Sequence, residues 1–338
     1  MLELVKWYYN LDKFTDEEEK SLNTPRCNDI IYNDDNYKML EKEYFDRMPF
    51  CNLNENEYHI TFNDSGTSFI NKIFEKEVDD DTLVITTTFE HPSVQDYSKN
   101  CKNIYLFKTT NEIKYCDIQQ LVNLSKQYKK VFVYIIGTRL DTGEIIPQWY
   151  FQELKKAFIE NNIEHKIMLD DVHGMFIVPR DYSIFDYILY TAHAIVKNYD
   201  MGLLISKSYD FGYKAYNWGK DYLERLDIIL KRRSKLNNFK NIMTDYFNKL
   251  LTNEHLQLYT NTVGHIFSIK IIDLTFNDND LNNLDEIYCI ENSSNKFNGW
   301  LRWRFQEFIM LDEKTILEGI KYLEKIISKA ILKNKLRG

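Results

Sequence analysis

Four polar clusters interrupt the apolar runs of the chain, and each holds side chains that could do chemistry. They occupy residues 64–68, 89–93, 169–174 and 191–197. Each cluster either follows a run with the pattern of a β-strand or precedes a helical pattern. Because ligands in an α/β protein bind beyond the carboxyl ends of the strands, the clusters predict one shared site at a sheet edge.

The first cluster, Asp-Ser-Gly-Thr-Ser at 64–68, lies directly before a helical run. Glycine lets backbone approach a ligand closely, while serine and threonine cap a helix and offer hydroxyl groups. The N–H groups and the dipole at the start of a helix bind anions such as phosphate. Gly66 and Thr67 are therefore candidate phosphate-binding residues, although most sequences of this kind are only helix caps.

The second and third clusters could hold a flat heteroaromatic ring. His91 follows a strand pattern, and its imidazole could lie on such a ring; the alternative is a histidine that forms hydrogen bonds within its loop. Asp170 ends another apolar run and could pair with a protonated pyridine nitrogen. His173 could then form a hydrogen bond with an oxygen atom on the ring.

The doubled carboxylate of Asp170 and Asp171 has two other interpretations. It could cap a helix, or it could bind a divalent metal ion. Few further metal ligands are evident, because His165 begins the same strand and would lie far away. We therefore predict no metal site.

The fourth cluster ends in Lys197, after a mostly apolar run. In such a place desolvation and a neighbouring cation can lower the pKa of a lysine, which makes the amine a nucleophile for aldehydes. The common alternative is a lysine that extends into solvent.

The elements that must position these clusters are short β-rich runs that alternate with helical patterns along the chain. Strand patterns occur at 81–88, 103–108, 130–137, 165–170, 186–196 and 202–206. Helical patterns follow Pro92 and occupy 116–128 and 147–162. Strands that alternate with helices predict a mostly parallel sheet with helices on both faces.

After residue 215 the pattern changes to a long helical stretch, 218–252. Three strand patterns and a final amphipathic helix follow, at 265–272, 286–291, 300–305 and 312–332. We predict three parts: an N-terminal helical arm, 1–45, that packs on the small domain; a large domain, 46–235; and a small C-terminal α+β domain, 236–338.

Composition excludes several classes of protein. The chain has 338 residues, a net charge of −8 and 44% hydrophobic residues, which argues for a sizeable core and against nucleic-acid binding. Its five cysteines are scattered without a paired motif, as in a reduced, cytoplasmic protein. Neither a signal peptide nor an apolar run of about 18 residues is present, so we expect no membrane association.

The series SGT, EHPS, LDDVHG and TAH before Lys197, with Leu-Arg-Trp-Arg at 301–304, resembles the fold-type I pyridoxal-phosphate (PLP) enzymes. The likeness covers about residues 60–310 and is greatest to class V aminotransferases and cysteine desulfurases. The LDDVHG segment is also similar to α-oxoamine synthases. The resemblance implies a fold-type I architecture, in which the large domain binds PLP.

By this resemblance, Lys197 would hold PLP as a Schiff base, and Asp170 would pair with the ring nitrogen. His91 would stack on the ring and His173 would touch the ring hydroxyl. The phosphate would be bound by residues of two clusters: Gly66, Thr67, Thr191 and His193.

One departure from the family concerns the lysine. The family usually has Ser/Thr-His-Lys or Ser-x-x-Lys, whereas three residues separate His193 from Lys197. Lys207 is therefore the second candidate. Lys197 is preferred because its distance from Asp170 along the chain resembles that of the family, and because 202–206 has the pattern of the strand that follows the lysine.

The reaction that the resemblance favours is transamination of an amino acid or related amine. Arg302 occupies a strand position similar to that of the family's carboxylate-binding arginine, and Arg304 lies on the same face by the period of two; surface ion pairs are the alternative for both. The family also implies a homodimer, because its pocket lies at a subunit interface.

Three alternatives remain open. Cysteine desulfuration needs a mobile thiol, but Cys289 lies inside a strand pattern. Another PLP lyase, a decarboxylase or an α-oxoamine synthase is also compatible, because the sequence does not determine which bond at Cα breaks. A catalytically silent protein that kept the fold as a binding module is the alternative outside enzymology.

Overall fold

The structure is a computed structural model of the whole chain. It describes residues 34–48, 52–63, 65–88, 90–107, 117–139, 144–175, 178–191, 201–207, 211, 219–220, 222–223, 226, 256–258, 266–271, 290–292, 300–304 and 313–335. The chain forms two compact units, one of residues 25–140 and 145–226 and the other of residues 1–24, 141–144 and 227–338.

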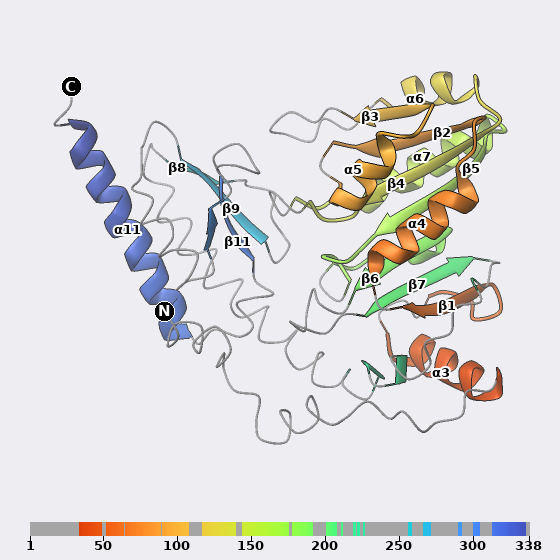
Figure 1. Cartoon of the computed structure of the whole chain (residues 1–338), viewed down its shortest axis with the longest axis horizontal. Coiled ribbons are helices and arrows are strands. Elements are labelled where there is room, and N and C mark those ends of the chain that lie inside the picture. Colours follow the sequence, from red (N-terminus) through yellow and green to blue (C-terminus); the bar gives the residue numbers. More distant parts are fainter. Residues whose placement is uncertain are drawn as a thin grey trace. The chain divides into compact units, whose positions relative to one another are not determined.

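A seven-stranded sheet forms the centre of the larger unit (Figure 1). Its strands are β1 (Tyr58–Asn63), β2 (Thr82–Thr87), β3 (Ile104–Phe107), β4 (Lys130–Ile136), β5 (Glu164–Asp170), β6 (Tyr187–Thr191) and β7 (Gly202–Lys207). They lie in the order β1-β7-β6-β5-β4-β2-β3. The pairs from β3 to β6 are parallel, whereas β7 runs antiparallel to both β6 and β1. The predicted α/β class with a mostly parallel sheet is confirmed.

Helices cover both faces of this sheet. They are α4 (Gly66–Glu77), α5 (Pro92–Ser98), α6 (Ile118–Ser125) and α7 (Gln148–Glu160). Phe69, Ile73 and Phe74 of α4 lie in a buried core with side chains from β2, β4, β5, β6 and β7. On the opposite face, Phe158 of α7 lies 5.3 Å from His165 of β5, ring centre to ring centre.

The helix α3 (Asp34–Arg47) packs on the large unit, which differs from the expectation that residues 1–45 pack on the small domain. Its Tyr44 hydroxyl donates to the Gly219 carbonyl over 2.7 Å, and the Tyr44 ring lies 4.9 Å from that of Phe62 in β1. The reason is an apolar face of α3, which includes Tyr37 and Tyr44 and is buried on β1. Residues 1–33 lie outside the described part, so the predicted domain boundaries stay predictions.

In the smaller unit, four antiparallel strands lie in the order β10-β11-β9-β8. These are β8 (Leu256–Leu258), β9 (Ile266–Ile271), β10 (Ile290–Asn292) and β11 (Trp300–Arg304), and the helix α11 (Glu313–Lys335) follows them. β9, β11 and α11 confirm the strands predicted near 265–272 and 300–305 and the final helix. β10 overlaps the predicted strand 286–291 only at residues 290 and 291, because residues 286–289 lie outside the described part. In the described ranges, no helix is both long and apolar enough to cross a bilayer.

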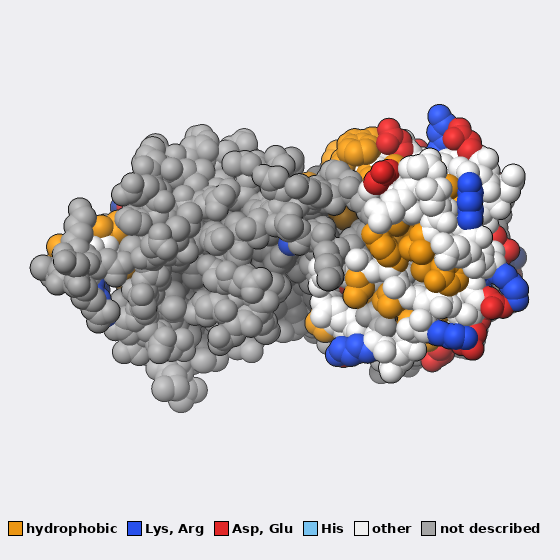
Figure 2. All heavy atoms as spheres, turned by 90° about the horizontal axis from the view of Figure 1, so that it is seen from above, with side chains coloured by type: hydrophobic (Ala, Val, Ile, Leu, Met, Phe, Trp, Pro, Cys, Tyr) orange, Lys and Arg blue, Asp and Glu red, His pale blue; other side chains and the backbone are white. Residues whose placement is uncertain are grey.

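The strand β3 forms one end of the large sheet, and its Leu106 is 41% exposed. Figure 2 shows the large unit from this side, with hydrophobic side chains gathered near the middle of the face. Acidic and basic side chains both lie around the margin, so this face presents no broad area of a single charge.

Glycines allow very close packing where α4 begins beside the ends of β6 and β7. A Cβ atom added to Gly66 would lie 2.7 Å from Cγ2 of Thr191, and one added to Gly202 would lie 2.8 Å from the Ser65 backbone. Thr191 and Gly202 are themselves paired. The first turn of α4 is therefore fixed against the end of β6.

This packing predicts that Gly66→Ala destabilises the protein by about 1–3 kcal/mol, because an added methyl group overpacks a close contact. The double variant Gly66→Ala/Thr191→Ser lacks the methyl group of Thr191 but keeps its hydroxyl, and it should regain most of the lost stability. Urea unfolding of the two single variants and the double variant measures this coupling. If Gly66→Ala lowered the free energy of unfolding equally in the wild type and in Thr191→Ser, the contact with the Thr191 methyl group would not be the cause of the destabilisation.

Candidate active site

The carboxyl ends of β2, β4, β5 and β6 lie at one edge of the sheet, because these strands are parallel. Asp170, the last residue of β5, pairs with Ile136 near the end of β4 and with Leu189 near the end of β6. Thr191 ends β6 at this edge, Gly66 is packed closely beside Thr191, and His91 follows the end of β2.

The Asp170 carboxylate is buried, with 3% of the residue exposed. Its Oδ2 accepts a hydrogen bond from the Tyr134 hydroxyl over 2.7 Å, and its Oδ1 accepts one from the Val172 N–H over 3.2 Å. Tyr134 lies on the neighbouring strand β4 and is fully buried, so it holds the carboxylate from the sheet side. A carboxylate has about four acceptor positions, so a further donor at Asp170 is compatible with these bonds.

A second buried carboxyl group, Glu90, lies close to this pair. Its two oxygens accept hydrogen bonds from the Thr87 hydroxyl and from the Ile136 N–H, which join the ends of β2 and β4. Burial raises the pKa of the Glu90 carboxyl well above its usual range, and the charge of Asp170 raises it further. Burial and the two carboxylates also raise the pKa of the Tyr134 phenol. Both shifts favour the neutral form of the group, so Tyr134 keeps the proton that it donates to Asp170.

Asp171 points into a different set of contacts from Asp170. Its Oδ1 lies 3.2 Å from Nε of Arg180, and its Oδ2 accepts from the Tyr182 hydroxyl over 2.6 Å. The Arg180 guanidinium also donates to the carbonyls of Gly137 and Ile146, over 2.7 and 2.9 Å. This buried pair ties the segment after β4 to the end of β5.

The turn after Asp171 carries His173, which is 6% exposed. The backbone N–H groups of Gly174 and Met175 donate to the Asp171 carbonyl over 3.0 and 2.9 Å. His173 therefore lies on a turn directly beyond the end of β5, and its contact with a ring oxygen stays a prediction.

His91 and Thr67 are connected through Ser93. The Ser93 hydroxyl lies 2.9 Å from Nδ1 of His91 and 3.0 Å from Oγ1 of Thr67. His91 caps α5, and Thr67 lies in the first turn of α4, whose cap is Ser65. The first and second clusters are thus joined by hydrogen bonds.

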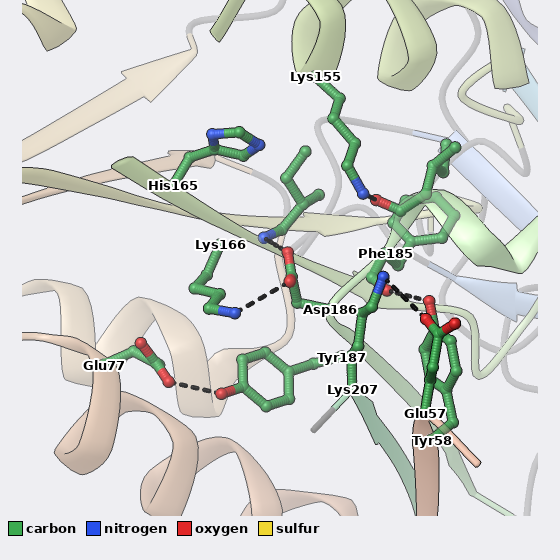
Figure 3. Close-up of polar contacts among 12 residues, drawn as sticks. Glu57, Tyr58, Glu77, Lys155, His165, Lys166, Phe185, Asp186, Tyr187 and Lys207 are labelled. Atoms are coloured by element: carbon green, nitrogen blue, oxygen red, sulfur yellow. Dashed lines mark hydrogen bonds and ion pairs between the residues drawn. The ribbon is translucent and has the colours of Figure 1, made fainter. Parts of the chain in front are cut away.

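Lys207, the second candidate for the reactive amine, lies at the opposite edge of the sheet. Figure 3 shows its side chain beside Glu57 and Tyr58. Because β7 is antiparallel to β6, Lys207 lies five residues from the Thr191–Gly202 pair, or about 17 Å along the strand. Its Nζ lies 3.3 Å from the Glu57 carboxylate and 5.7 Å from the centre of the Tyr58 ring. The structure therefore does not bring Lys207 together with Asp170.

Other predicted residues lie wholly or partly outside the described part of the chain. Lys197, His193 and Cys289 lie outside the described residues. Arg302 and Arg304 are placed on β11 through their backbone, two positions apart and so on the same face, while their side chains lie outside the described part. Their roles stay predictions.

Searched within its described ranges, the chain has no group of three or more His, Cys, Asp or Glu side chains that could hold a metal ion. The adjacent carboxylates of Asp170 and Asp171, which could have suggested a metal site, contact two different sets of partners. Asp170 binds Tyr134 and the Val172 N–H, while Asp171 binds Arg180 and Tyr182.

No protein-family model and no curated protein matches the sequence. Solved structures match over almost the whole chain. A NifS-like protein from Rickettsia africae is 16% identical, with a TM-score of 0.74 and coverage of 95% of this chain and 98% of that one. A PLP-dependent aminotransferase from Streptococcus suis is 14% identical, with a TM-score of 0.70 and 97% of each chain covered. The chain has the fold of the fold-type I PLP-dependent enzymes.

A PLP-bound C-S lyase from Staphylococcus hominis has the same fold, at 11% identity, a TM-score of 0.63 and coverage of 95% of this chain and 91% of that one. The three proteins are named for different activities. At these identities the likeness shows the fold-type I architecture and leaves the reaction to be argued from the residues.

The residues at the sheet edge fit PLP by their chemistry. A buried carboxylate at Asp170 suits a protonated ring nitrogen, and a 12-residue helix that begins at Gly66 with a hydroxyl at Thr67 suits a phosphate. His91 and His173 add two imidazole groups from the ends of β2 and β5. The donor set therefore matches both charged ends of this cofactor.

Sequence analysis missed the residues that hold the predicted ones: Glu90, Ser93, Tyr134, Arg180 and Tyr182. Tyr134 lies in an apolar run typical of core, and Arg180 lies in a loop ten residues after Asp170. One signal was present, because Glu90 and Ser93 belong to the quoted cluster at 89–93, but only the histidine was interpreted.

The Asp171 carboxyl has a raised pKa of about 6, because burial outweighs the opposing effects of Arg180 and Tyr182. A carboxyl with a raised native pKa binds its proton more tightly in the folded state. Its contribution to stability is therefore lost as the pH rises from about 4 to about 6, by about 3 kcal/mol. We predict that the free energy of unfolding of the wild type falls relative to that of Asp171→Asn over this interval.

Urea unfolding of both proteins at several pH values measures this difference. The asparagine cannot titrate, so the variant provides the reference for the remaining carboxyl groups. A wild type that instead gains stability over Asp171→Asn as the pH rises would mean that the Arg180 ion pair dominates burial.

Proposed function

We propose that this chain is a PLP-dependent enzyme that transfers the amino group of an amino acid or related amine. The observation that carries the proposal is the buried Asp170 carboxylate at the carboxyl edge of the sheet, where α4 begins and His91 lies. Bound PLP supplies an electron sink that weakens the bonds at Cα of the substrate. The NifS-like protein and the aminotransferase share the fold, which supports the choice of cofactor.

Each predicted residue has a role in holding this cofactor. Asp170 would keep the ring nitrogen protonated, and Tyr134 would hold the carboxylate in position. His91 would stack on the ring, and His173 would donate to the ring hydroxyl. The phosphate would be bound by residues at the start of α4 and after β6: Gly66, Thr67, Thr191 and His193.

Lys197 is the proposed covalent partner of PLP and the group that moves a proton from Cα of the substrate. Thr191 and Gly202 are paired at the site edge, so the segment between them begins and ends there. Lys197 is the only lysine in the sequence of that segment. Lys207, by contrast, is engaged with Glu57 at the far edge.

Transamination is proposed over decarboxylation because Arg302 or Arg304 would hold the substrate carboxylate through two hydrogen bonds. A carboxylate held in this way is kept from leaving, so the proton on Cα is the group removed. The amine of Lys197 would accept this proton from Cα of the substrate and deliver it to C4′ of the cofactor.

The proposal predicts that purified full-length protein incubated with PLP becomes yellow and that borohydride removes the colour. Mass spectrometry should then find the reduced cofactor attached to Lys197, since a reduced bond between the amine and PLP is stable. Lys197→Ala should lose the attachment, while the control Lys207→Ala should keep it. Attachment to Lys207 would overturn the assignment, and PLP that binds without any attachment would indicate a catalytically silent protein.

The protein incubated with PLP and not treated with borohydride, when mixed with a panel of amino acids, identifies the reaction. An aminotransferase yields a keto acid and converts the cofactor to its amine form. Alanine from cysteine, with its sulfur released as sulfide only when a thiol reductant is added, would instead show a desulfurase. Pyruvate, ammonia and sulfide from cysteine without a reductant would show a C-S lyase. Absence of all these products from every amine would contradict an enzyme of this class.

We also propose a homodimer, because the fold-type I pocket would be completed by the neighbouring subunit. Light scattering of the purified protein should give a mass twice that of the chain, about 81 kDa from a chain mass of 40.7 kDa. A monomer at the concentrations used for cofactor binding would contradict this assembly.

A further inference from the structure

Three side chains from two helix starts form a continuous hydrogen-bonded chain. The Thr67 hydroxyl lies 3.0 Å from the Ser93 hydroxyl, which lies 2.9 Å from Nδ1 of His91. The backbone N–H of Ser93 lies 3.2 Å from the same nitrogen. Ser93 thus connects the proposed phosphate residue Thr67 to the proposed stacking residue His91.

The direction of these bonds follows from the donor inventory. A backbone N–H can only donate, so Nδ1 of His91 is an acceptor and the proton of the neutral ring lies on Nε2. The Ser93 hydroxyl must then donate its single proton to Nδ1. Because that proton is used, the bond between the two hydroxyls is donated by Thr67 to Ser93.

An anion at the start of α4 changes this arrangement. The Thr67 hydroxyl has one proton, and donation to a phosphate oxygen removes it from Ser93. Oγ1 of Thr67 then remains available as an acceptor. Rotation of the Ser93 hydroxyl toward it restores the contact, and Nδ1 of His91 keeps only its backbone donor.

We infer that the Ser93 hydroxyl is a hydrogen-bond switch that reports phosphate occupancy at Thr67 to His91. In the absence of the anion it donates to Nδ1 of His91, and with the anion bound it donates to Oγ1 of Thr67. This inference rests on the proposed function, because the phosphate of PLP would be the natural anion. Ser93 is a positioning residue here, since it acts on the cofactor only through its two neighbours.

The switch would couple two steps of cofactor binding. When the phosphate is absent, two donors on Nδ1 hold the imidazole in one orientation. When the phosphate is seated, one of these donors is withdrawn, and the imidazole is held less tightly while the ring of the cofactor arrives. The number of hydrogen bonds is conserved, so the exchange has little intrinsic cost.

The test uses the full-length protein freed of cofactor, labelled with 15N, and titrated with inorganic phosphate. The His91 ring signals are assigned by their absence in His91→Asn. We expect the Nδ1 signal to move downfield with phosphate, because loss of a hydrogen bond to a pyridine-type nitrogen shifts its resonance in that direction. The backbone amides of Gly66 and Thr67 should move with the same dissociation constant.

Two variants separate the switch from simple binding. In Ser93→Ala the amides of Gly66 and Thr67 should still respond to phosphate, while the response of Nδ1 should be lost. Ser93→Thr keeps a hydroxyl and should keep the response. Both variants retain the backbone N–H that fixes the ring proton on Nε2.

The possible failures are distinguishable. Amides that respond while Nδ1 does not, or an Nδ1 response that persists in Ser93→Ala, would overturn the switch and leave the phosphate site intact. Amides that do not respond at all would overturn both the switch and the phosphate site of the proposed function. An Nδ1 signal typical of a protonated nitrogen in the free protein would also overturn the inference.

Discussion

The arrangement of the site depends on one constraint, the burial of carboxylates where β5 ends. Removing an ionised carboxylate from water costs several kcal/mol unless partners replace the water. Asp171 has a cationic partner in Arg180, and the raised pKa of Glu90 favours its neutral form. The hydrogen bonds to Asp170 from Tyr134 and from the Val172 N–H come from neutral donors. The three acids at this edge thus meet the cost of burial in three different ways.

This division is what makes Asp170 suited to a cationic ring nitrogen under the proposed function. Asp171, which already has an arginine partner, would gain little from a second cation, because the first has met most of its cost. At Asp170 the Tyr134 hydroxyl and the Val172 N–H fix the position of the two carboxylate oxygens. The raised pKa of Glu90 acts in the same direction, because a second negative charge in this space would favour protonation of Asp170 itself.

Much of the fold was predictable, because the signals were local. The short apolar, β-rich runs predicted the strands of the parallel sheet, and polar residues directly after those runs identified the edge. The contacts that hold the site were not predictable, because they join residues distant in the chain: Tyr134 with Asp170, and Arg180 with Gly137. The direction of β7 was also hidden, since a buried strand has the same apolar pattern whether it is parallel or antiparallel. For α3, a polar composition concealed the few aromatic residues that bury it on β1.

The reversal of β7 bears directly on the choice of lysine. Had β7 run parallel to β6, Lys207 would lie at the carboxyl edge, and spacing alone would separate the two candidates. Because β7 is antiparallel, it begins beside Thr191 and carries Lys207 away to Glu57. The connection between β6 and β7 then has both ends at the edge where Asp170 lies, and only one of its residues is a lysine. The strand topology is therefore a stronger argument for Lys197 than the sequence motif around the lysine.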